Sequence, residues 1–286
     1  MSSAKHKALF FSVAVLALSS CKSATLGGRS DLADNIAQSG QFMRKEIDAN
    51  PFRITTFQKM SQSTAPTTRI YIEGDGQAWL SRTQPSLNPT PTDPFALKLA
   101  RQDSAPNIIY MARPCQYSGR IDGALCASQY WRSARYAPEV INSYNVALNQ
   151  IKAQHNVQNF ELVGYSGGGT LAALLAAHRN DVASLRTIAG NLDHREHSRV
   201  HNVSPLSASL NPPDYAARLS AIPQVHFIGN NDDIVPPNVY QSYARAFSNQ
   251  SCLQYKIVGD KGHASENWQK DWPALLNHKP HCQVQF

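Results

Sequence analysis

The chain has 286 residues, 42% of them hydrophobic, and a formal net charge of +7. It is long enough to enclose one sizeable core, and we predict no second domain and no internal repeat. Its 27 basic residues are scattered rather than grouped into runs, which predicts a mildly basic surface and argues against a nucleic-acid partner. None of the five cysteines forms a Cys-x-x-Cys pair, so we expect neither a metal nor a cofactor.

The first 20 residues are typical of an export signal. Lys5 and Lys7 precede an apolar run, Ala8–Leu18, whose eleven residues match a signal-peptide core and are too few to span a bilayer. The run ends in Leu-Ser-Ser-Cys at Cys21, which resembles the bacterial lipobox. We therefore predict a signal peptide over residues 1–20 and a lipidated Cys21, with an ordinary secretory signal and a chance cysteine as the alternative.

The segment after Cys21 is polar and poor in bulky apolar residues. We predict that residues 21–50 tether a folded domain, residues 51–286, to a membrane through the lipid. Lys22 stands where inner-membrane lipoproteins carry an aspartate, which favours the outer membrane of a bacterial envelope.

Short apolar runs alternate with helical patterns along the rest of the chain. Strands are predicted over Arg53–Gln58, Thr68–Gly74, Asn107–Pro114, Asn159–Tyr165, Ser184–Gly190, Gln224–Asn230 and Leu253–Gly259. Helices are predicted over Pro94–Arg101, Pro138–Gln154, Gly168–His178, Val239–Phe247 and Glu266–Leu276. The central runs are apolar throughout, as in strands buried on both faces, so the pattern predicts a mostly parallel sheet with helices on both faces. In such sheets the chemistry lies at the carboxyl ends of the strands.

Export also determines what the remaining cysteines imply. If Cys21 is lipidated, four cysteines remain in an oxidising compartment, an even number that can form two disulfides: Cys115, Cys126, Cys252 and Cys282. Three pairings are possible, and we predict the most local one, Cys115–Cys126 with Cys252–Cys282. The first bond would close a loop, and the second would fasten the C-terminal tail to the body.

The segment Gly164–Gly168 fits Gly-x-Ser-x-Gly, with Ser166 between a predicted strand and a predicted helix. A nucleophile on such a tight turn has strained dihedral angles, and its neighbours must be small so that strand and helix can approach. The turn also directs the N–H of Gly167 and the positive end of the following helix at a reacting oxygen. The alternative is a purely structural glycine-rich turn.

From about Arg53 to Leu276 the chain resembles the α/β-hydrolases, in which nucleophile, acid and histidine follow successive strand ends in that order. Gly229–Pro236 matches the family pattern Gly-x-x-Asp-x-x-Val-Pro, which places an acid at Asp232. His263 follows the last predicted strand and precedes the last predicted helix.

The resemblance assigns a role to each residue. Ser166 would attack a carbonyl carbon, and His263 would take the serine proton and then give it to the leaving group. Asp232 would hold the imidazole in one tautomer and stabilise its charged form. Asp233, its neighbour, and Asp193, one strand earlier, are the alternative acids.

A second oxyanion donor is expected in the loop after an early strand. By resemblance we predict the N–H of Asp75, or next to it that of Gly76, while Glu73 stands where the family often has histidine. A carboxylate would oppose a nearby oxyanion, so the Asp75 side chain should turn away, either capping a local N–H or pairing with Arg82 or Arg113. A plain glycine turn is the alternative.

Further features bear on the site. His194, His197 and His201 could face one way on a helix and hold zinc, but the preferred interpretation is a polar segment over the site. Little room for a lid domain remains between Gly190 and Gln224. Four aromatic residues are candidates for the pocket wall, although a core role is more common for each: Trp79, Tyr117, Trp131 and Tyr165.

The sequence therefore predicts a lipid-anchored serine hydrolase of the bacterial envelope. It would cleave a small-molecule or lipid-like carboxylic ester through an acyl-enzyme intermediate. A thioesterase or acyltransferase would use the same triad, and a non-catalytic envelope-binding lipoprotein would keep the fold without the activity. The sequence predicts no oligomeric state.

Overall fold

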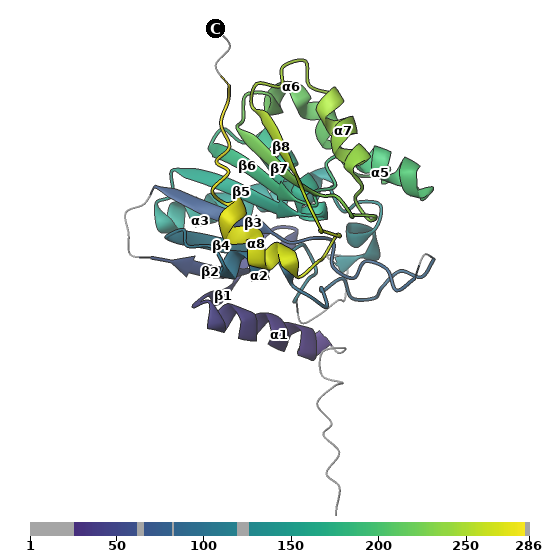
Figure 1. The fold of residues 1–286 in the computed structure, drawn as a ribbon. Coiled ribbons are helices and arrows are strands. Elements are labelled where there is room, and N and C mark those ends of the chain that lie inside the picture. Colours follow the sequence, from purple (N-terminus) through teal and green to yellow (C-terminus); the bar gives the residue numbers. More distant parts are fainter. Residues whose placement is uncertain (1–25, 62–65, 82, 119–125, 284–286) are drawn as a thin grey trace, which may run out of the picture.

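The computed structural model describes residues 26–61, 66–81, 83–118 and 126–283 (Figure 1). The predicted signal peptide, Cys21 and Lys22 lie outside the described residues, as does Arg82. Within those ranges, no helix combines the length and the hydropathy that a membrane span requires.

The described strands form one eight-stranded sheet in the order β1-β2-β4-β3-β5-β6-β7-β8. The strands are β1 (Met43–Ala49), β2 (Phe52–Met60), β3 (Thr67–Ile72), β4 (Asn107–Met111), β5 (Asn159–Tyr165), β6 (Val182–Ile188), β7 (Gln224–Gly229) and β8 (Leu253–Val258). β2 pairs antiparallel with β1 and with β4, and every other neighbouring pair is parallel. The seven predicted strands and the mostly parallel sheet are thereby confirmed.

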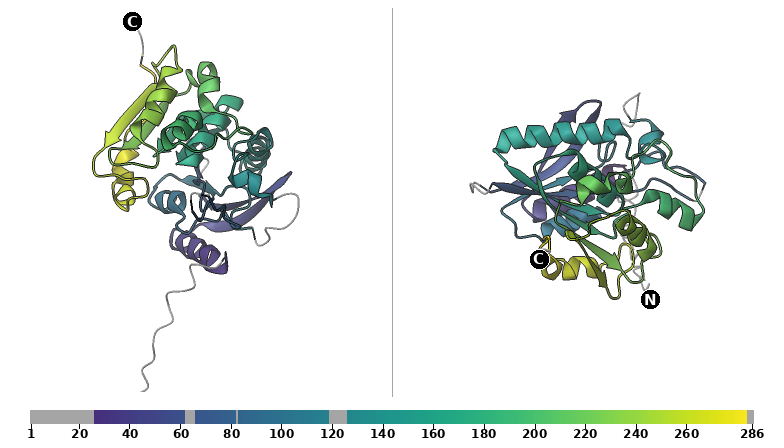
Figure 2. Two further views of the ribbon diagram at one scale, coloured as in Figure 1. Left: turned by 90° about the vertical axis from the view of Figure 1, so that its right-hand side faces the viewer. Right: turned by 90° about the horizontal axis from the view of Figure 1, so that it is seen from above.

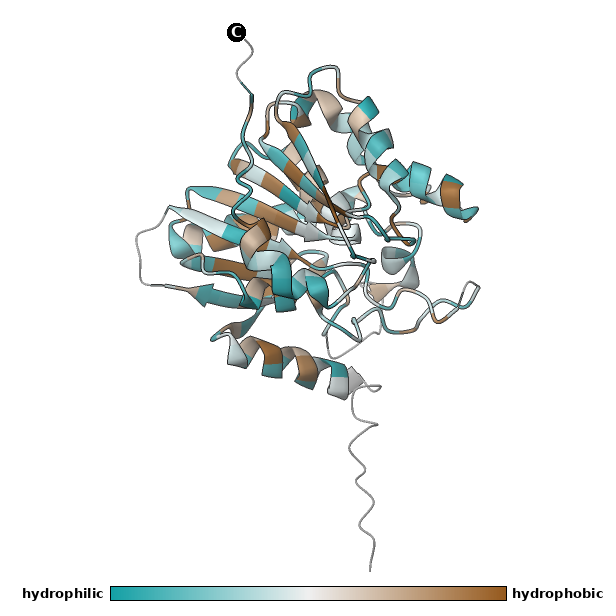
Figure 3. Ribbon diagram, viewed as in Figure 1, coloured by the Kyte–Doolittle hydropathy of each residue, from teal (hydrophilic) through white to brown (hydrophobic). Residues whose placement is uncertain are grey.

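Helices cover both faces of the sheet (Figure 2). The α-helices are α1 (Leu26–Ser39), α2 (Phe95–Arg101), α3 (Pro138–His155), α4 (Gly167–His178), α5 (His194–His201), α6 (Ala216–Leu219), α7 (Pro237–Arg245) and α8 (Asn267–Leu275). α1, α2 and α8 share one hydrophobic cluster, whereas α3, α4, α6 and α7 share the other. The central strand β3 supplies both, because Ile70 and Ile72 point to one cluster and Tyr71 to the other. Figure 3 shows the hydrophobic residues gathered on the central strands.

The predicted tether over residues 21–50 is wrong from Leu26 onward, because that segment is part of the folded domain. α1 buries Ala33 and Ala37 in the cluster that also contains α2. β1 then extends the sheet by pairing with β2 along its whole length. Alanine side chains are large enough to fill this contact, since α1 packs closely against α2.

Both predicted disulfides are present, Cys115–Cys126 and Cys252–Cys282. The first closes a loop after β4, and the second joins the start of β8 to the C-terminal tail. The tail is also held by the N–H of Gln283, which donates at 2.8 Å to the carbonyl just before Cys252.

The segment between β6 and β7 is described throughout. It contains α5, a short 3₁₀ helix (Pro212–Tyr215) and α6, and no lid domain, as predicted. The carboxyl ends of the parallel strands therefore open toward loops rather than toward a separate cap.

Candidate active site

Ser166 occupies the sharp corner between β5 and α4. Its φ of 51° and ψ of −121° are strained for a residue with a side chain, and the corner is held by the Ser166 N–H, which donates to Ile188 O at 3.0 Å. The flanking glycines are required by contact distance: a Cβ atom added to Gly164 would lie 2.3 Å from Gly168 O. One added to Gly168 would lie 2.2 Å from Ile72 O on β3. The packing of strand against helix therefore fixes the position of the serine.

His263 bridges Ser166 and Asp232. Its Nε2 lies 2.9 Å from Ser166 Oγ, and its Nδ1 lies 2.9 Å from Asp232 Oδ2. Because an ionised carboxylate can only accept, Nδ1–H donates to Asp232, which leaves Nε2 to accept from the serine hydroxyl. The Asp232 side chain is fully buried and its Oδ1 also accepts from the N–H groups of Ile234 and Val235, at 3.0 and 2.8 Å. These bonds hold the carboxylate in position beside the imidazole.

The two alternative acids have other positions. Asp233 is exposed at the turn that follows β7, while its neighbour Asp232 points inward. Asp193 begins α5 and accepts from the N–H groups of Arg195 and Glu196, at 3.1 and 3.2 Å. Its second oxygen accepts from Ser242 Oγ at 2.7 Å. Asp193 is thus a helix cap, and of the three aspartates the structure brings only Asp232 to His263.

The loop after β3 lies directly beside the serine. A Cβ atom added to Gly74 would be 3.4 Å from the Cβ of Ser166. In the part of the chain that the structure describes, the N–H groups of Asp75 and Gly167 have no hydrogen-bond acceptor. Gly167 is the first residue of α4, where N–H groups have no partner within the helix. The two N–H groups are therefore free to bind an oxyanion.

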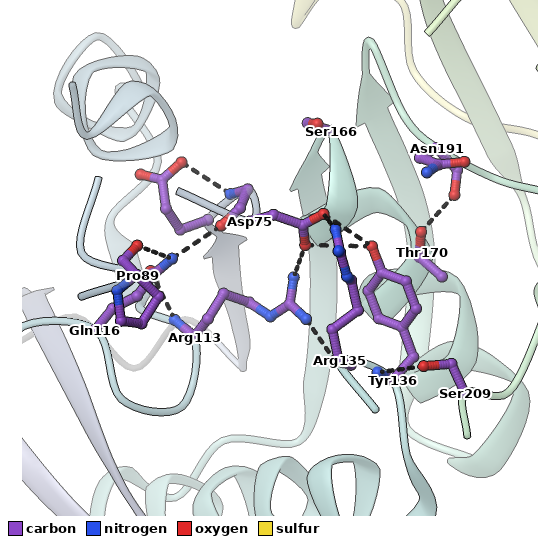
Figure 4. Close-up of polar contacts among 12 residues, drawn as sticks. Asp75, Pro89, Arg113, Gln116, Arg135, Tyr136, Ser166, Thr170, Asn191 and Ser209 are labelled. Carbon is purple, nitrogen blue, oxygen red and sulfur yellow. Dashed lines mark hydrogen bonds and ion pairs between the residues drawn. The ribbon is translucent and has the colours of Figure 1, made fainter. Parts of the chain in front are cut away.

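The Asp75 side chain lies beneath this corner, between two arginines (Figure 4). Its Oδ1 accepts from Arg113 Nη1 at 2.8 Å and from the Tyr136 hydroxyl at 3.3 Å, and its Oδ2 pairs with Arg135 Nη1. Burial alone would raise the pKa of the Asp75 carboxyl, but Arg135 and Arg113 outweigh it and lower the pKa to about 2. A Cβ atom added to Gly167 would lie 2.2 Å from Asp75 Oδ1, so the carboxylate packs directly under the first turn of α4.

Glu73 occupies the position where the family resemblance suggested histidine. It is buried, and burial raises the pKa of its carboxyl to about 7. Its oxygens accept from the N–H groups of Gly74 and Ala96 and from the Tyr110 hydroxyl, at 2.9, 3.2 and 3.1 Å. Glu73 therefore joins the loop after β3 to α2 and holds the loop in place.

A cavity of about 1030 Å³ opens over Ser166 and His263. Of the four aromatic candidates, Trp79 and Tyr165 line it, whereas Tyr117 and Trp131 are buried outside it. The Tyr165 ring stacks on Phe95 at 4.3 Å. The remaining wall comes from the loop after β3, from the loop before α3 that contains Arg132, Ser133 and Arg135, from the end of α5 with the residues that follow it, and from the turn after β7.

The three histidines of α5 do not face one way. His194 is buried and its Nε2 bonds to Leu210 O at 3.1 Å, whereas His197 and His201 lie side by side at the cavity wall with ring centroids 4.6 Å apart. No group of three potential ligands is arranged to hold a metal ion among the residues that the structure describes. The interpretation of α5 as a polar segment over the site agrees with this geometry.

Two partners of Asp75 could not be predicted from the sequence. Arg113 is a predicted partner, whereas Arg135 and the Tyr136 hydroxyl, 3.3 Å from Asp75 Oδ1, are not. Arg135 lies in the loop before α3, sixty residues beyond its partner, and no spacing rule connects such positions. The one available indication was chemical, since a carboxylate beside an oxyanion site requires a compensating cation.

The fold is that of the α/β-hydrolases, as solved structures with 11–14% sequence identity show. XC6422 from Xanthomonas campestris, an α/β serine hydrolase without a lid, has a TM-score of 0.54 and 14% identity over 83% of this chain and 92% of its own. Est1E from Butyrivibrio proteoclasticus has a TM-score of 0.53 and 11% identity, with coverage of 82% and 96%. An α/β serine hydrolase homologue from Coxiella burnetii has a TM-score of 0.57 and 14% identity, with coverage of 83% and 97%.

The sequence also matches the family model "Serine hydrolase (FSH1)" over residues 122–264, half of the chain. The chain therefore belongs to the FSH1 serine hydrolase family. A search of curated proteins finds none that matches it.

Proposed function

We propose that this serine hydrolase cleaves carboxylic esters, with Ser166 as the nucleophile, His263 as the general base and acid, and Asp232 as the residue that orients the histidine. The observation that carries the proposal is the continuous hydrogen-bonded chain from Asp232 through His263 to Ser166, with both links at 2.9 Å. A nucleophile activated by a base that a third group orients is the arrangement that acyl transfer requires.

In the proposed reaction, Ser166 Oγ attacks the ester carbonyl carbon while its proton moves to Nε2 of His263. The carbonyl oxygen becomes an oxyanion that the N–H groups of Asp75 and Gly167 bind. His263 then protonates the departing alcohol, which leaves an acyl group on Ser166. A water molecule deprotonated by His263 attacks this acyl group, and the acid leaves with the serine restored.

The paired arginines make the oxyanion site compatible with an aspartate. Without a counter-charge, the Asp75 carboxylate would repel a developing oxyanion at the N–H of its own residue. Arg113 and Arg135 neutralise that carboxylate, and the positive end of α4 adds to the attraction. Removal of one donor from an oxyanion hole costs about 10²–10³ in turnover in enzymes where it has been measured.

Hydrolysis is favoured over acyl transfer because water can reach the nucleophile. Ser166 is partly exposed at the floor of an open cavity, and no lid covers it in the described chain. An acyltransferase must exclude water from its acyl-enzyme, and nothing in the described walls does so. Est1E, a neighbour in fold, has been solved with ferulic acid bound, and a carboxylic acid is the class of product that we propose for this protein.

We further propose that the protein is anchored by lipid at Cys21 in the bacterial envelope, with the outer membrane favoured by Lys22. The support is the run of basic, apolar and small residues that ends at Cys21. Cys21→Ser should prevent lipidation and release the protein from membranes after a salt wash. If the variant still fractionates with membranes, the anchor lies elsewhere.

The hydrolase proposal is tested by Ser166→Ala, with Ser133→Ala as the control because that serine also lines the cavity. A fluorophosphonate probe should label the wild type and the control but not Ser166→Ala. Hydrolysis of a short acyl ester should fall by several orders of magnitude in Ser166→Ala only. An unlabelled wild type would indicate the non-catalytic lipoprotein instead, and turnover by a folded Ser166→Ala would exclude this mechanism.

A further inference from the structure

Three of the nine large hydrophobic side chains that are exposed in the described chain line the cavity: Trp79, Val203 and Ile234. Two more, Leu80 and Leu87, lie on the loop after β3 that carries Trp79. We name these five residues, at exposures of 39–85%, the apolar rim. Single exposed apolar residues are ordinary on soluble proteins, whereas a group of them around one opening marks an interaction site.

The loop that carries Leu80 and Leu87 is held by internal hydrogen bonds. Leu80 N–H donates to Gln84 O at 2.8 Å, and Ser86 N–H donates to Ala78 O at 3.0 Å. The buried Trp131 indole donates to Ser86 O at 2.9 Å and ties the loop to the domain. Leu87 is nevertheless 85% exposed, so the fold holds this side chain outward.

The N-terminal end of α1 lies against the same loop. Arg29, on the first turn of α1, donates to Thr90 O at 2.9 Å and bonds to the Gln77 side chain. Figure 1 shows that α1 begins on the side of the molecule where the parallel strands end. Five residue steps separate Cys21 from Leu26, and they reach at most about 18 Å even when fully extended. A lipid on Cys21 would therefore enter the membrane close to the rim.

The charge of the rim suits a phospholipid surface. The Arg132 guanidinium lies over the Trp79 ring at 5.2 Å and borders the cavity, and it has no carboxylate partner among the described residues. An aromatic ring, aliphatic side chains and an unpaired cation together match the boundary between acyl chains and phosphates.

We propose that the apolar rim seats on the bilayer that holds the Cys21 lipid, so that the cavity receives esters directly from that bilayer. The inference rests on the ester hydrolysis and the lipid anchor proposed above. A bilayer is favoured over a protein partner because the anchor keeps the rim within reach of the bilayer at all times. Such tethering converts weak insertion into stable contact.

Trp79 offers a direct test, because it is the one exposed tryptophan of four: Trp131, Trp268 and Trp272 are at most 4% exposed. The lipidated protein should be reconstituted in phosphatidylethanolamine and phosphatidylglycerol vesicles whose acyl chains carry bromine, a short-range quencher. We expect Trp79 fluorescence to be quenched, and Trp79→Phe to remove the quenched component. Equal quenching in wild type and Trp79→Phe overturns the proposal, as does a protein that does not remain with the vesicles.

The second test uses Leu80→Ser/Leu87→Ser, with Met43→Ser/Ile257→Ser as the matched control. Met43 and Ile257 are 65% and 55% exposed and lie on strands at the two edges of the sheet. We expect the rim variant to hydrolyse a vesicle-borne ester about tenfold more slowly than the control does.

Hydrolysis of a short, water-soluble ester tests the proposed hydrolase activity alone, because this substrate does not require contact with a membrane. It should stay within about twofold of wild type in both variants, since neither replaces a cavity-lining residue. Equal rates of both variants on vesicles overturn the rim proposal and leave the hydrolase proposal intact. If the wild type does not hydrolyse the water-soluble ester at all, the hydrolase proposal itself is refuted.

Discussion

Replacing Asp75 with asparagine should destabilise the folded protein at neutral pH, because it removes the charge that Arg113 and Arg135 surround. The pKa of the Asp75 carboxyl is lowered to about 2 from an ordinary 3.8. At about 1.4 kcal/mol for each pH unit, that difference corresponds to roughly 2 kcal/mol of stability when the carboxylate is ionised. Arg113 is 4% exposed and would remain charged without its partner, so the loss could reach about 3–5 kcal/mol.

The lowered pKa also predicts how the stability lost in Asp75→Asn changes with pH. A lowered carboxyl pKa contributes stability above pH 3.8, and that contribution is lost as the pH falls toward 2. The free energy of unfolding of wild type and Asp75→Asn should therefore differ at pH 7 and converge near pH 2. The control is Asp214→Asn, whose ion pair with Arg195 has side chains 45% and 59% exposed and should contribute less than about 1 kcal/mol.

Urea denaturation at several pH values measures the change in stability. Ester turnover measures the second expected consequence of Asp75→Asn, which is a loss of catalytic rate. Because the Asp75 N–H is a proposed oxyanion donor, a displaced loop should lower kcat more than it raises KM. A stability difference that persists unchanged at pH 2 would show that packing rather than charge is responsible. Equal stability of Asp75→Asn and wild type at pH 7 would refute the electrostatic argument altogether.

Three further predictions concern the same site. Asp232→Asn should reduce turnover by about 10⁴-fold through the wrong histidine tautomer, whereas Asp233→Asn should stay within a few-fold, as steady-state assays of folded variants will show. Gly164→Ala should lower the free energy of unfolding by about 2 kcal/mol or more, because its Cβ would lie 2.3 Å from a backbone oxygen; Gly259→Ala, with nothing within 4 Å, should not. Thermal scans decide that comparison. The raised pKa of Glu73, about 7 against an ordinary 4.5, means that its ionisation destabilises the fold as the pH rises from 4.5 through 7. Glu73→Gln should therefore lose less stability than wild type between pH 5 and pH 8 in urea titrations.

The central sheet was predictable because parallel strands buried on both faces are apolar along their whole length. β1 was missed for the opposite reason, since its sequence Met-Arg-Lys-Glu-Ile-Asp-Ala lies at an edge and exposes most of its side chains. α1 was missed because it begins with two glycines after its first leucine and buries chiefly small residues such as Ala33 and Ala37. Each element therefore has only a weak hydrophobic pattern, because β1 buries Ile47 and Ala49 alone and α1 buries chiefly alanines at helical spacing.

The positions of Ser166, Asp232 and His263 were predictable because each follows a strand whose carboxyl end lies at one edge of the sheet. The sequence could also indicate that Asp75 requires a compensating charge, since the chemistry of the oxyanion site demands it. It could not identify Arg135 as a partner, because that contact depends on how two distant loops pack.

In the exported protein that we propose, the two disulfides differ in the order in which their cysteines would emerge from an export channel. Cys115 and Cys126 are 11 residues apart and would both be outside before Cys252, whereas Cys252 must wait for Cys282, 30 residues later. Closing a short loop costs little chain entropy, so the first bond can form before a competing thiol arrives. Directional emergence would thus suppress both non-native pairings, and a chain with this layout should need little help from a disulfide isomerase.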